Sequence, residues 1–182
     1  MQCRAELVTD LFLESLRGLD VTLEFGIQTI HETEAEIINR KIDIRKIEQA
    51  LASLKSRGIK HEVSLIFGLP TQTLSSFKAS VSWCLAHKIP VIKAFPLMLL
   101  RGTKLAGEAS RWSMKESETT IPWVKSSDSF TEDDWFKMDA IAVALRNTET
   151  RHPEKLNELA LEAPYQFAAK RWCPAALTQR EI

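Results

Sequence analysis

The chain has 182 residues, and 45% of them are hydrophobic, so it is long and apolar enough to bury the core of one ordinary domain. Lys and Arg number 24, as do Asp and Glu, so no net charge draws the chain to nucleic acid or to an anionic membrane. The sequence has no apolar run of 18 residues and no signal-like start, so neither a membrane span nor secretion is expected.

The cysteines Cys3, Cys84 and Cys173 lie far apart, without a C-x-x-C pair. This spacing matches neither a disulfide framework nor a zinc site, and it favours a reducing, cytoplasmic location. The four histidines show no metal-ligand spacing, so we assign no residue to a metal.

The first predicted element is an amphipathic helix that ends near Gly18. Its apolar stripe is formed by Leu7, Val8, Leu11 and Leu16. Three strands follow at residues 21–28, 61–68 and 91–100. In the first, Leu23, Phe25 and Ile27 alternate with polar or small residues.

Helices are predicted between the strands. Residues 34–39 form a short one, Asp43 caps a longer one that ends at Gly58, and residues 74–87 present an apolar side. This alternation of strands and helices predicts a parallel α/β fold.

The C-terminal part is predicted to be helical and partly irregular. Residues 105–111 form a short helix, and a polar loop continues to residue 129. Thr131 and Asp134 form a capping box for the next helix. The last predicted helix, residues 156–172, is broken by Pro164, and the chain after it is expected to be weakly ordered.

Three segments in this order carry a resemblance: LEFGIQT followed by INRK, then SLIFGLP, then FPLMLLRGT. They are similar to the radical S-adenosylmethionine superfamily, nearest the branch of oxygen-independent coproporphyrinogen oxidase and the cobalamin-type enzymes. The resemblance implies a partial, TIM-like (βα) barrel of about three parallel strands covered by helices, with a C-terminal helical extension. Residues 1–112 would form the C-terminal half of the barrel, residues 113–150 a loop and packing helix, and residues 151–182 a weakly ordered helical tail.

The family's C-x-x-x-C-x-x-C motif, whose thiolates hold a [4Fe–4S] cluster, is not found in this sequence. The resemblance therefore implies a fragment that binds S-adenosylmethionine but needs the N-terminal half of a barrel to generate a 5′-deoxyadenosyl radical. Cobalamin is compatible with the family, although no residue here indicates it. The alternative is a non-catalytic α/β binding module or a truncated gene product. The strand edge at residues 21–28 is expected to favour self-association.

The resemblance assigns three residues of the first strand to the cofactor site. Gln28 would contact the ribose, and the alternative is a strand-end side chain that binds a loop backbone. Gly26 would let the ligand approach the strand. Glu24 would bind the amino group of S-adenosylmethionine or close the barrel interior.

Arg40 and Ser64 complete the polar part of the predicted site. Arg40 would pair with the carboxylate of S-adenosylmethionine through its forked guanidinium, or form a surface ion pair with Glu36. Ser64 stands where many members of the family have an aspartate for the ribose hydroxyls, which puts ribose binding in question.

The apolar part of the predicted site comes from the second and third strands. Ile66 and Phe95 would lie against adenine, together with Leu97 and Met98, although such residues are also ordinary core. Lys93 shares the phase of Phe95, so it faces a substrate or protects an edge strand from aggregation.

Overall fold

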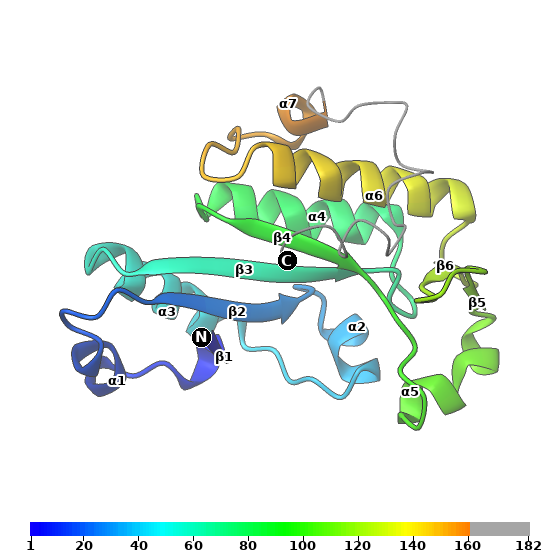
Figure 1. The fold of residues 1–182 in the computed structure, drawn as a ribbon, viewed down its shortest axis with the longest axis horizontal. Helices are drawn as coiled ribbons and strands as arrows, with labels where there is room; N and C mark the ends of the chain where they lie inside the picture. Colours follow the sequence, from blue (N-terminus) through cyan, green and yellow to red (C-terminus); the bar gives the residue numbers. More distant parts are fainter. Residues whose placement is uncertain (161–182) are drawn as a thin grey trace, which may run out of the picture.

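A four-stranded, all-parallel sheet is the centre of the computed structural model, which describes residues 1–160 (Figure 1). Its strands lie in the order β1 (Gln2–Cys3), β2 (Thr22–Gln28), β3 (Lys60–Phe67) and β4 (Ile92–Pro96). The three predicted strands are therefore confirmed, and β4 ends at Pro96, which has no N–H to donate to a strand ladder.

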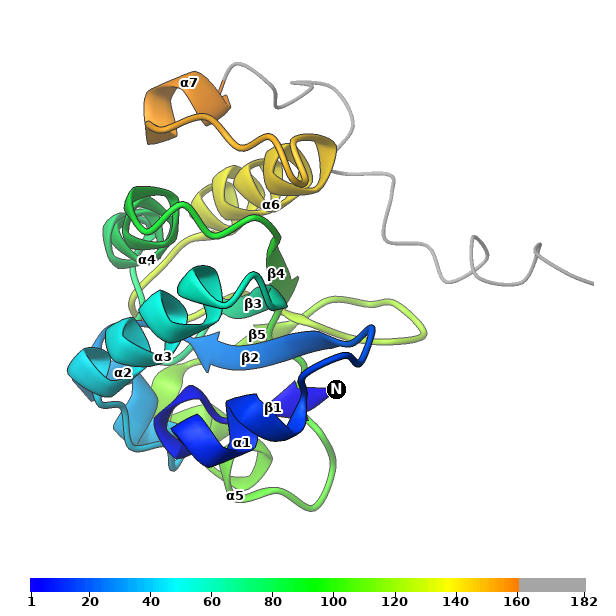
Figure 2. The same ribbon diagram turned by 90° about the vertical axis from the view of Figure 1, so that its left-hand side faces the viewer.

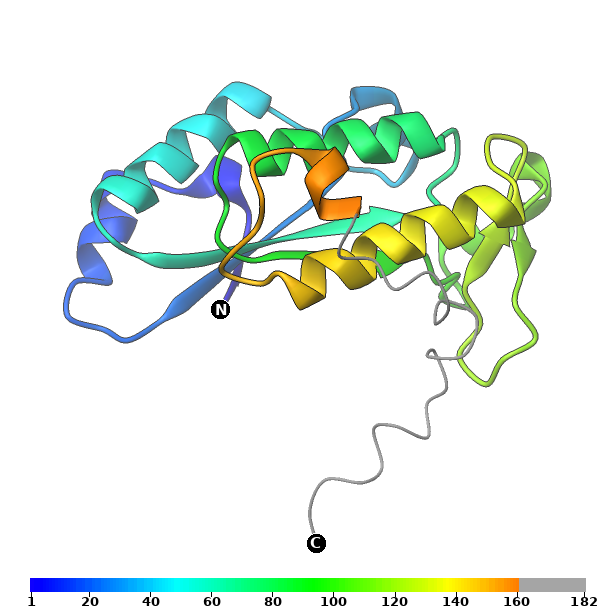
Figure 3. The ribbon, with the colours of Figure 1, turned by 90° about the horizontal axis from the view of Figure 1, so that it is seen from above.

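Helices connect the strands, and further helices come after the last strand of the sheet in the chain. They are η1 (Ala5–Leu7), α1 (Asp10–Ser15), α2 (Glu32–Ile37), α3 (Ile44–Ser56), α4 (Leu74–Ala86), α5 (Lys104–Gly107), η2 (Ala109–Trp112), α6 (Glu132–Asn147) and α7 (Leu156–Ala160). Figure 2 shows α3 and α4 on the same side of the sheet. Seen from above, α6 runs beside α4 and along β4 (Figure 3).

The core lies between the sheet and these helices. Phe25, Val63 and Phe67 are fully buried on the sheet face that meets the helices, and each such side chain contributes about 1.5–3 kcal/mol by its removal from water. The ring of Phe67 lies 5.6 Å from that of Phe77 in α4 and 5.5 Å from that of Trp135 in α6. These aromatic contacts hold both helices to the C-terminal half of β3.

Two predicted helix starts are confirmed by their caps. The side chain of Asp43 accepts a hydrogen bond from Lys46 N at 3.2 Å at the start of α3. At α6, the Thr131 hydroxyl accepts from Asp134 N at 3.2 Å, and the Asp134 carboxylate accepts from Thr131 N at 3.1 Å. Hydrogen bonds from Thr131 also lower the pKa of Asp134.

The prediction for the N-terminus is wrong. Two short helical pieces replace the single helix, and Thr9 caps the second of them, which changes the phase of the apolar face. Leu13 is therefore the buried residue of α1, whereas Leu7 and Leu11 are 72% and 82% exposed. The chain starts with β1, which pairs with Glu24 and Phe25, so the predicted free edge of the first long strand is partly covered.

The C-terminal part differs in detail from the prediction. The polar loop contains a two-stranded hairpin of β5 (Lys115–Glu116) and β6 (Val124–Ser126). α7 is the beginning of the helix predicted over residues 156–172, and its remainder, with Pro164 and the tail, lies outside the described residues. Within residues 1–160, no helix has the length and apolar character that crossing a bilayer requires.

Candidate functional site

Six of the seven predicted site residues lie on one face of the sheet, opposite the buried core residues. They are Glu24, Gly26, Gln28, Ser64, Ile66 and Phe95. The register makes neighbours of Gly26 and Ser64 and of Ile66 and Phe95. Because the strands are parallel, their C-terminal ends meet at one edge of the sheet, which is where α/β folds commonly bind ligands.

Gln28 ends β2 in an unusual backbone conformation. Its φ is +65°, and Thr29 N donates to Ile27 O at 2.9 Å, which makes Gln28 the central residue of a tight γ-turn. A β-bulge accompanies this turn between Gly26 and Gln28. A positive φ is uncommon for a residue with a side chain, and such strained residues cluster at functional sites.

The turn folds the Gln28 carboxamide back over Gly26. A Cβ added at Gly26 would lie 2.5 Å from Gln28 Nε2, so only glycine leaves room for the carboxamide. In this structure the space beside Gly26 holds the Gln28 side chain, and the approach of a ligand at Gly26 stays a prediction. Gln28 is 9% exposed, and its buried Oε1 has no hydrogen-bond partner within residues 1–160. The alternative that Gln28 binds a loop backbone finds no support in this arrangement.

Arg40 comes to the same place from the loop after α2. Arg40 Nη1 donates to Gly26 O at 2.6 Å, whereas no ion pair with Glu36 is found among the described residues. Burial and the nearby Arg4 lower the pKa of Arg40, an effect that Glu6 partly opposes. A guanidinium stays charged in proteins, and its other N–H groups remain available to a ligand.

Ser64 lies beside Gly26 on the neighbouring strand. It is 7% exposed, and its hydroxyl makes no hydrogen bond to any residue in the described part of the chain. Gln28 Oε1, Arg40 and the Ser64 hydroxyl thus offer acceptors and donors on one small area of the sheet. Because buried polar groups in proteins are nearly always hydrogen-bonded, this area favours a polar ligand.

Apolar side chains border this polar area. Ile66 is half-buried, and Phe95 and Met98 are 40% and 42% exposed on or just after β4. Leu97, by contrast, is buried in the core. The site therefore combines a polar part with exposed apolar side chains against which a planar ring can pack.

Glu24 lies away from these residues, toward the N-terminal end of β2. It pairs in register with Glu62 and accepts a hydrogen bond from Gln2 Nε2 at 3.3 Å. Lys93 Nζ lies 2.8 Å from Glu62 Oε1 on the sheet face that carries Ser64, and β4 is an edge strand, so both expectations for Lys93 stay predictions. Gln2 and Glu62 were not predicted from the sequence.

The described residues do not supply an iron–sulfur cluster. No group of three or more His, Cys, Asp or Glu side chains that could hold a metal ion is found in residues 1–160. Cys84 is buried in the core, which raises the pKa of its thiol, while Cys3 lies on β1 and Cys173 falls outside the described residues. A [4Fe–4S] cluster needs closely spaced thiolates, so these two cysteines do not fit one.

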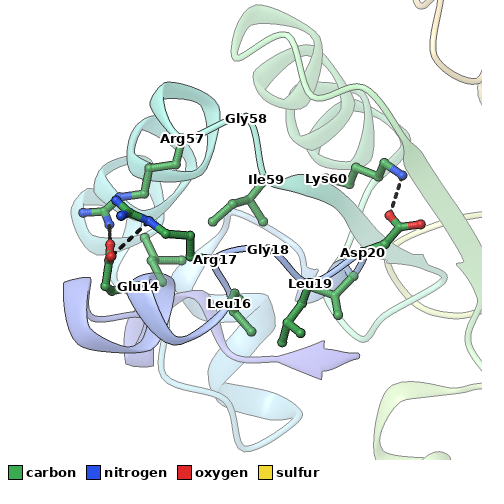
Figure 4. A pocket seen from close by; sticks show the side chains of 12 residues that line it. Glu14, Leu16, Arg17, Gly18, Leu19, Asp20, Arg57, Gly58, Ile59 and Lys60 are labelled. Atoms are coloured by element: carbon green, nitrogen blue, oxygen red, sulfur yellow. Dashed lines mark hydrogen bonds and ion pairs between the residues drawn. The ribbon is translucent and has the colours of Figure 1, made fainter.

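A cavity of about 350 Å³ lies at the opposite end of the sheet, between the ends of α1 and α3 (Figure 4). Its charged side chains are already paired: Lys60 Nζ lies 2.7 Å from Asp20 Oδ1, and Arg57 pairs with Asp10 and Glu14. This cavity therefore lacks the unpartnered polar groups that mark the C-terminal end of the sheet.

Comparisons with known proteins bear on the family and on the fold. Residues 1–84 match the model of the Radical SAM superfamily. The uncharacterized protein MJ0486 of Methanocaldococcus jannaschii is 32% identical over 88 residues, which are 48% of this chain and 27% of that protein.

Two solved structures have a similar fold. An N-terminally shortened Elp3 of Methanocaldococcus infernus matches with a TM-score of 0.61 at 18% identity, over 79% of this chain and 32% of that one. The methyltransferase TsrM of Kitasatospora setae, solved with cobalamin and a [4Fe–4S] cluster, matches with a TM-score of 0.57 at 17% identity, over 67% of this chain and 26% of TsrM.

The chain spans about a third or less of the length of the curated relatives that it matches. The branch of coproporphyrinogen oxidase and the cobalamin-type enzymes stays a prediction. The family match covers residues 1–84, and the two solved structures share the parallel fold. Residues 1–84 of this chain, somewhat under half of its 182 residues, are thus similar to the radical SAM superfamily.

Proposed function

We propose that this chain binds S-adenosylmethionine at the C-terminal ends of β2 and β3. The observation that carries the proposal is the group of polar side chains with unused hydrogen-bonding capacity: Gln28, Arg40 and Ser64. Gln28 Oε1 is the buried member of this group, and leaving such an acceptor unpaired costs about 1–3 kcal/mol, a cost that a polar ligand removes.

The chemistry of the ligand matches the chemistry of this area. The Gln28 carboxamide and the Ser64 hydroxyl suit the ribose hydroxyls, which both donate and accept hydrogen bonds. Arg40 suits the carboxylate of the methionine part, because its N–H groups can pair with both oxygens. Ile66 and Phe95 would cover the adenine ring.

The redox chemistry would come from outside the described residues. In the superfamily, a [4Fe–4S] cluster supplies the electron that cleaves bound S-adenosylmethionine, and this sequence has no C-x-x-x-C-x-x-C motif to hold one. We therefore assign to this chain the binding and orientation of S-adenosylmethionine, with the cluster thiolates on further strands of a barrel. Cobalamin has no support from any described residue.

Those further strands would be the main partner of this chain. β1 is the outer strand of the sheet on that side, so its outer edge is where a barrel would continue. We also propose that the outer edge of β1 allows the chain to self-associate. A cytoplasmic location is the last part of the proposal.

Replacing Ser64 with alanine tests the nucleoside part. The Ser64 hydroxyl has no partner in residues 1–160, so its removal is expected to leave the free energy of unfolding nearly unchanged. A hydroxyl that binds ribose contributes about 1 kcal/mol, so the affinity for adenosine should fall about fivefold. Isothermal titration calorimetry measures the affinity for adenosine, and unfolding in urea measures the free energy of unfolding.

The matched control is Thr148→Val, which removes another buried hydroxyl. Thr148 directly follows α6, and its hydroxyl donates to Ala144 O at 2.8 Å. It lies near the N-terminal end of β4, because it also bonds His152, which accepts from Ile92 N. This variant should lose stability and keep its affinity for adenosine. If Ser64→Ala loses stability and binds adenosine like the wild type, the Ser64 hydroxyl serves the fold and the proposed nucleoside contact is wrong.

A further inference from the structure

The strained turn at Gln28 is connected to a buried polar network that neither motif nor spacing revealed. A non-glycine residue at φ +65° in a γ-turn persists only where its surroundings hold it. The residue that follows, Thr29, is fully buried, and its hydroxyl donates to Glu34 Oε2 at 2.5 Å. The same hydroxyl accepts from His31 N at 3.1 Å. The turn is thus tied to the first residues of α2.

Glu34 connects this turn to the next strand. It is 2% exposed, and its Oε2 also accepts a hydrogen bond from Gln72 Nε2 at 3.2 Å. Two donors, from residues 43 positions apart in the sequence, Thr29 and Gln72, therefore meet on one carboxylate oxygen. Hydrogen bonds to a charged group are stronger than those between neutral groups, and a low local dielectric strengthens them further.

Gln72 in turn holds the end of β3. Its Oε1 accepts from Gly68 N at 2.7 Å and from Leu69 N at 3.3 Å, and its Nε2 donates to Ile66 O at 3.2 Å. Gln72 has no exposed surface. The end of β3, which carries Ile66, is therefore fixed to the same carboxylate as the turn that carries Gln28.

The geometry points to Glu34 and Gln72 as positioning residues for the site, an inference that rests on the proposed function. Neither side chain lies on the ligand face of the sheet. Their hydrogen bonds fix the backbone on both sides of the ligand, hold Gln28 in its strained turn and keep its carboxamide over Gly26. The network thus preorganises the site, because the turn at Gln28 is already formed before the ligand binds.

Glu34→Ala and Gln72→Ala are expected to bind S-adenosylmethionine about tenfold more weakly than the wild type, because only a fraction of the molecules then has the binding-competent turn. Glu34→Gln keeps an oxygen that can accept from Thr29 and Gln72, so it should restore most of the affinity. Thr148→Val is the control for a general loss of stability, since its hydroxyl bonds lie at the opposite end of the sheet. All variants are compared under conditions in which circular dichroism shows them folded.

A second readout does not require binding. The backbone carbon chemical shifts of Gln28 report a positive φ, and we expect them to move toward extended values in Glu34→Ala and Gln72→Ala but not in Glu34→Gln or Thr148→Val. Unchanged Gln28 shifts in both alanine variants would overturn the inference. A wild-type protein that does not bind S-adenosylmethionine would instead contradict the proposed function, and the Gln28 shifts would still decide this inference.

Discussion

Arg40→Ala is expected to weaken the binding of S-adenosylmethionine about ten- to a hundredfold and to leave the affinity for adenosine unchanged. The guanidinium of Arg40 is anchored by one bond, Nη1 to Gly26 O at 2.6 Å, and its remaining N–H groups can pair with a carboxylate. A hydrogen bond to a charged group contributes about 1.5–3 kcal/mol, which gives the expected range. Adenosine lacks the carboxylate, so its affinity for the protein should not change in Arg40→Ala. Calorimetric titration with each ligand measures both affinities.

Two further variants sharpen this experiment. Arg40→Lys keeps the charge but not the planar fork, so it should recover only part of the affinity for S-adenosylmethionine. Arg45→Ala removes an exposed arginine of α3 and should behave like the wild type with both ligands. An equal loss of adenosine and S-adenosylmethionine affinity in Arg40→Ala would mean that Arg40 supports only the local structure through Gly26.

Asp139→Asn should raise the free energy of unfolding by roughly 2 kcal/mol at pH 7. Asp139 lies in α6 with 2% of its surface exposed, and burial raises the pKa of its carboxyl group from 3.8 to about 6, an effect that Arg146 partly opposes. At neutral pH the folded protein therefore carries a buried charge that the unfolded chain exposes to water at no cost. Asparagine keeps the shape of the side chain without that charge.

The pH dependence gives the sign of this effect. The folded protein binds the Asp139 proton more tightly than the unfolded chain, so the contribution of Asp139 to stability is present below about pH 4 and is lost as the pH rises through about 6. The advantage of Asp139→Asn should accordingly vanish below about pH 4. Urea unfolding of both proteins between pH 3.5 and 7.5 measures the difference, and a constant difference across this range would show that the carboxyl group titrates normally.

The main strands and the face of the site could be predicted from the sequence. Side chains alternate along a strand with a period of two, so the phase of Leu23 and Phe25 fixes which face Glu24 and Gly26 occupy. Parallel neighbours then bring Ser64 beside Gly26, as the register confirms. Helix starts were also predictable, because the Thr131 and Asp134 pair acts locally.

Other features depend on contacts that a sequence pattern does not encode. The Gln28 carboxamide covers Gly26 only because the backbone of Gln28 has a positive φ. A glutamine in the sequence does not predict a positive φ. Glu34 and Gln72 meet across 38 sequence positions, and each by itself reads as an ordinary helix-start or turn residue. Glu24 was assigned to the ligand from the resemblance, and the structure places it nearer the other end of β2.

The central claim is that S-adenosylmethionine binds at the C-terminal ends of β2 and β3, and an NMR titration of the ¹⁵N-labelled protein tests it most directly. Added S-adenosylmethionine should shift the side-chain amide signals of Gln28 and the backbone signals of Ser64 and Ile66. The signals of Arg17 and Lys60, at the cavity on the other end of the sheet, should stay in place. Shifts confined to that cavity, or no shifts at millimolar ligand, would contradict the claim.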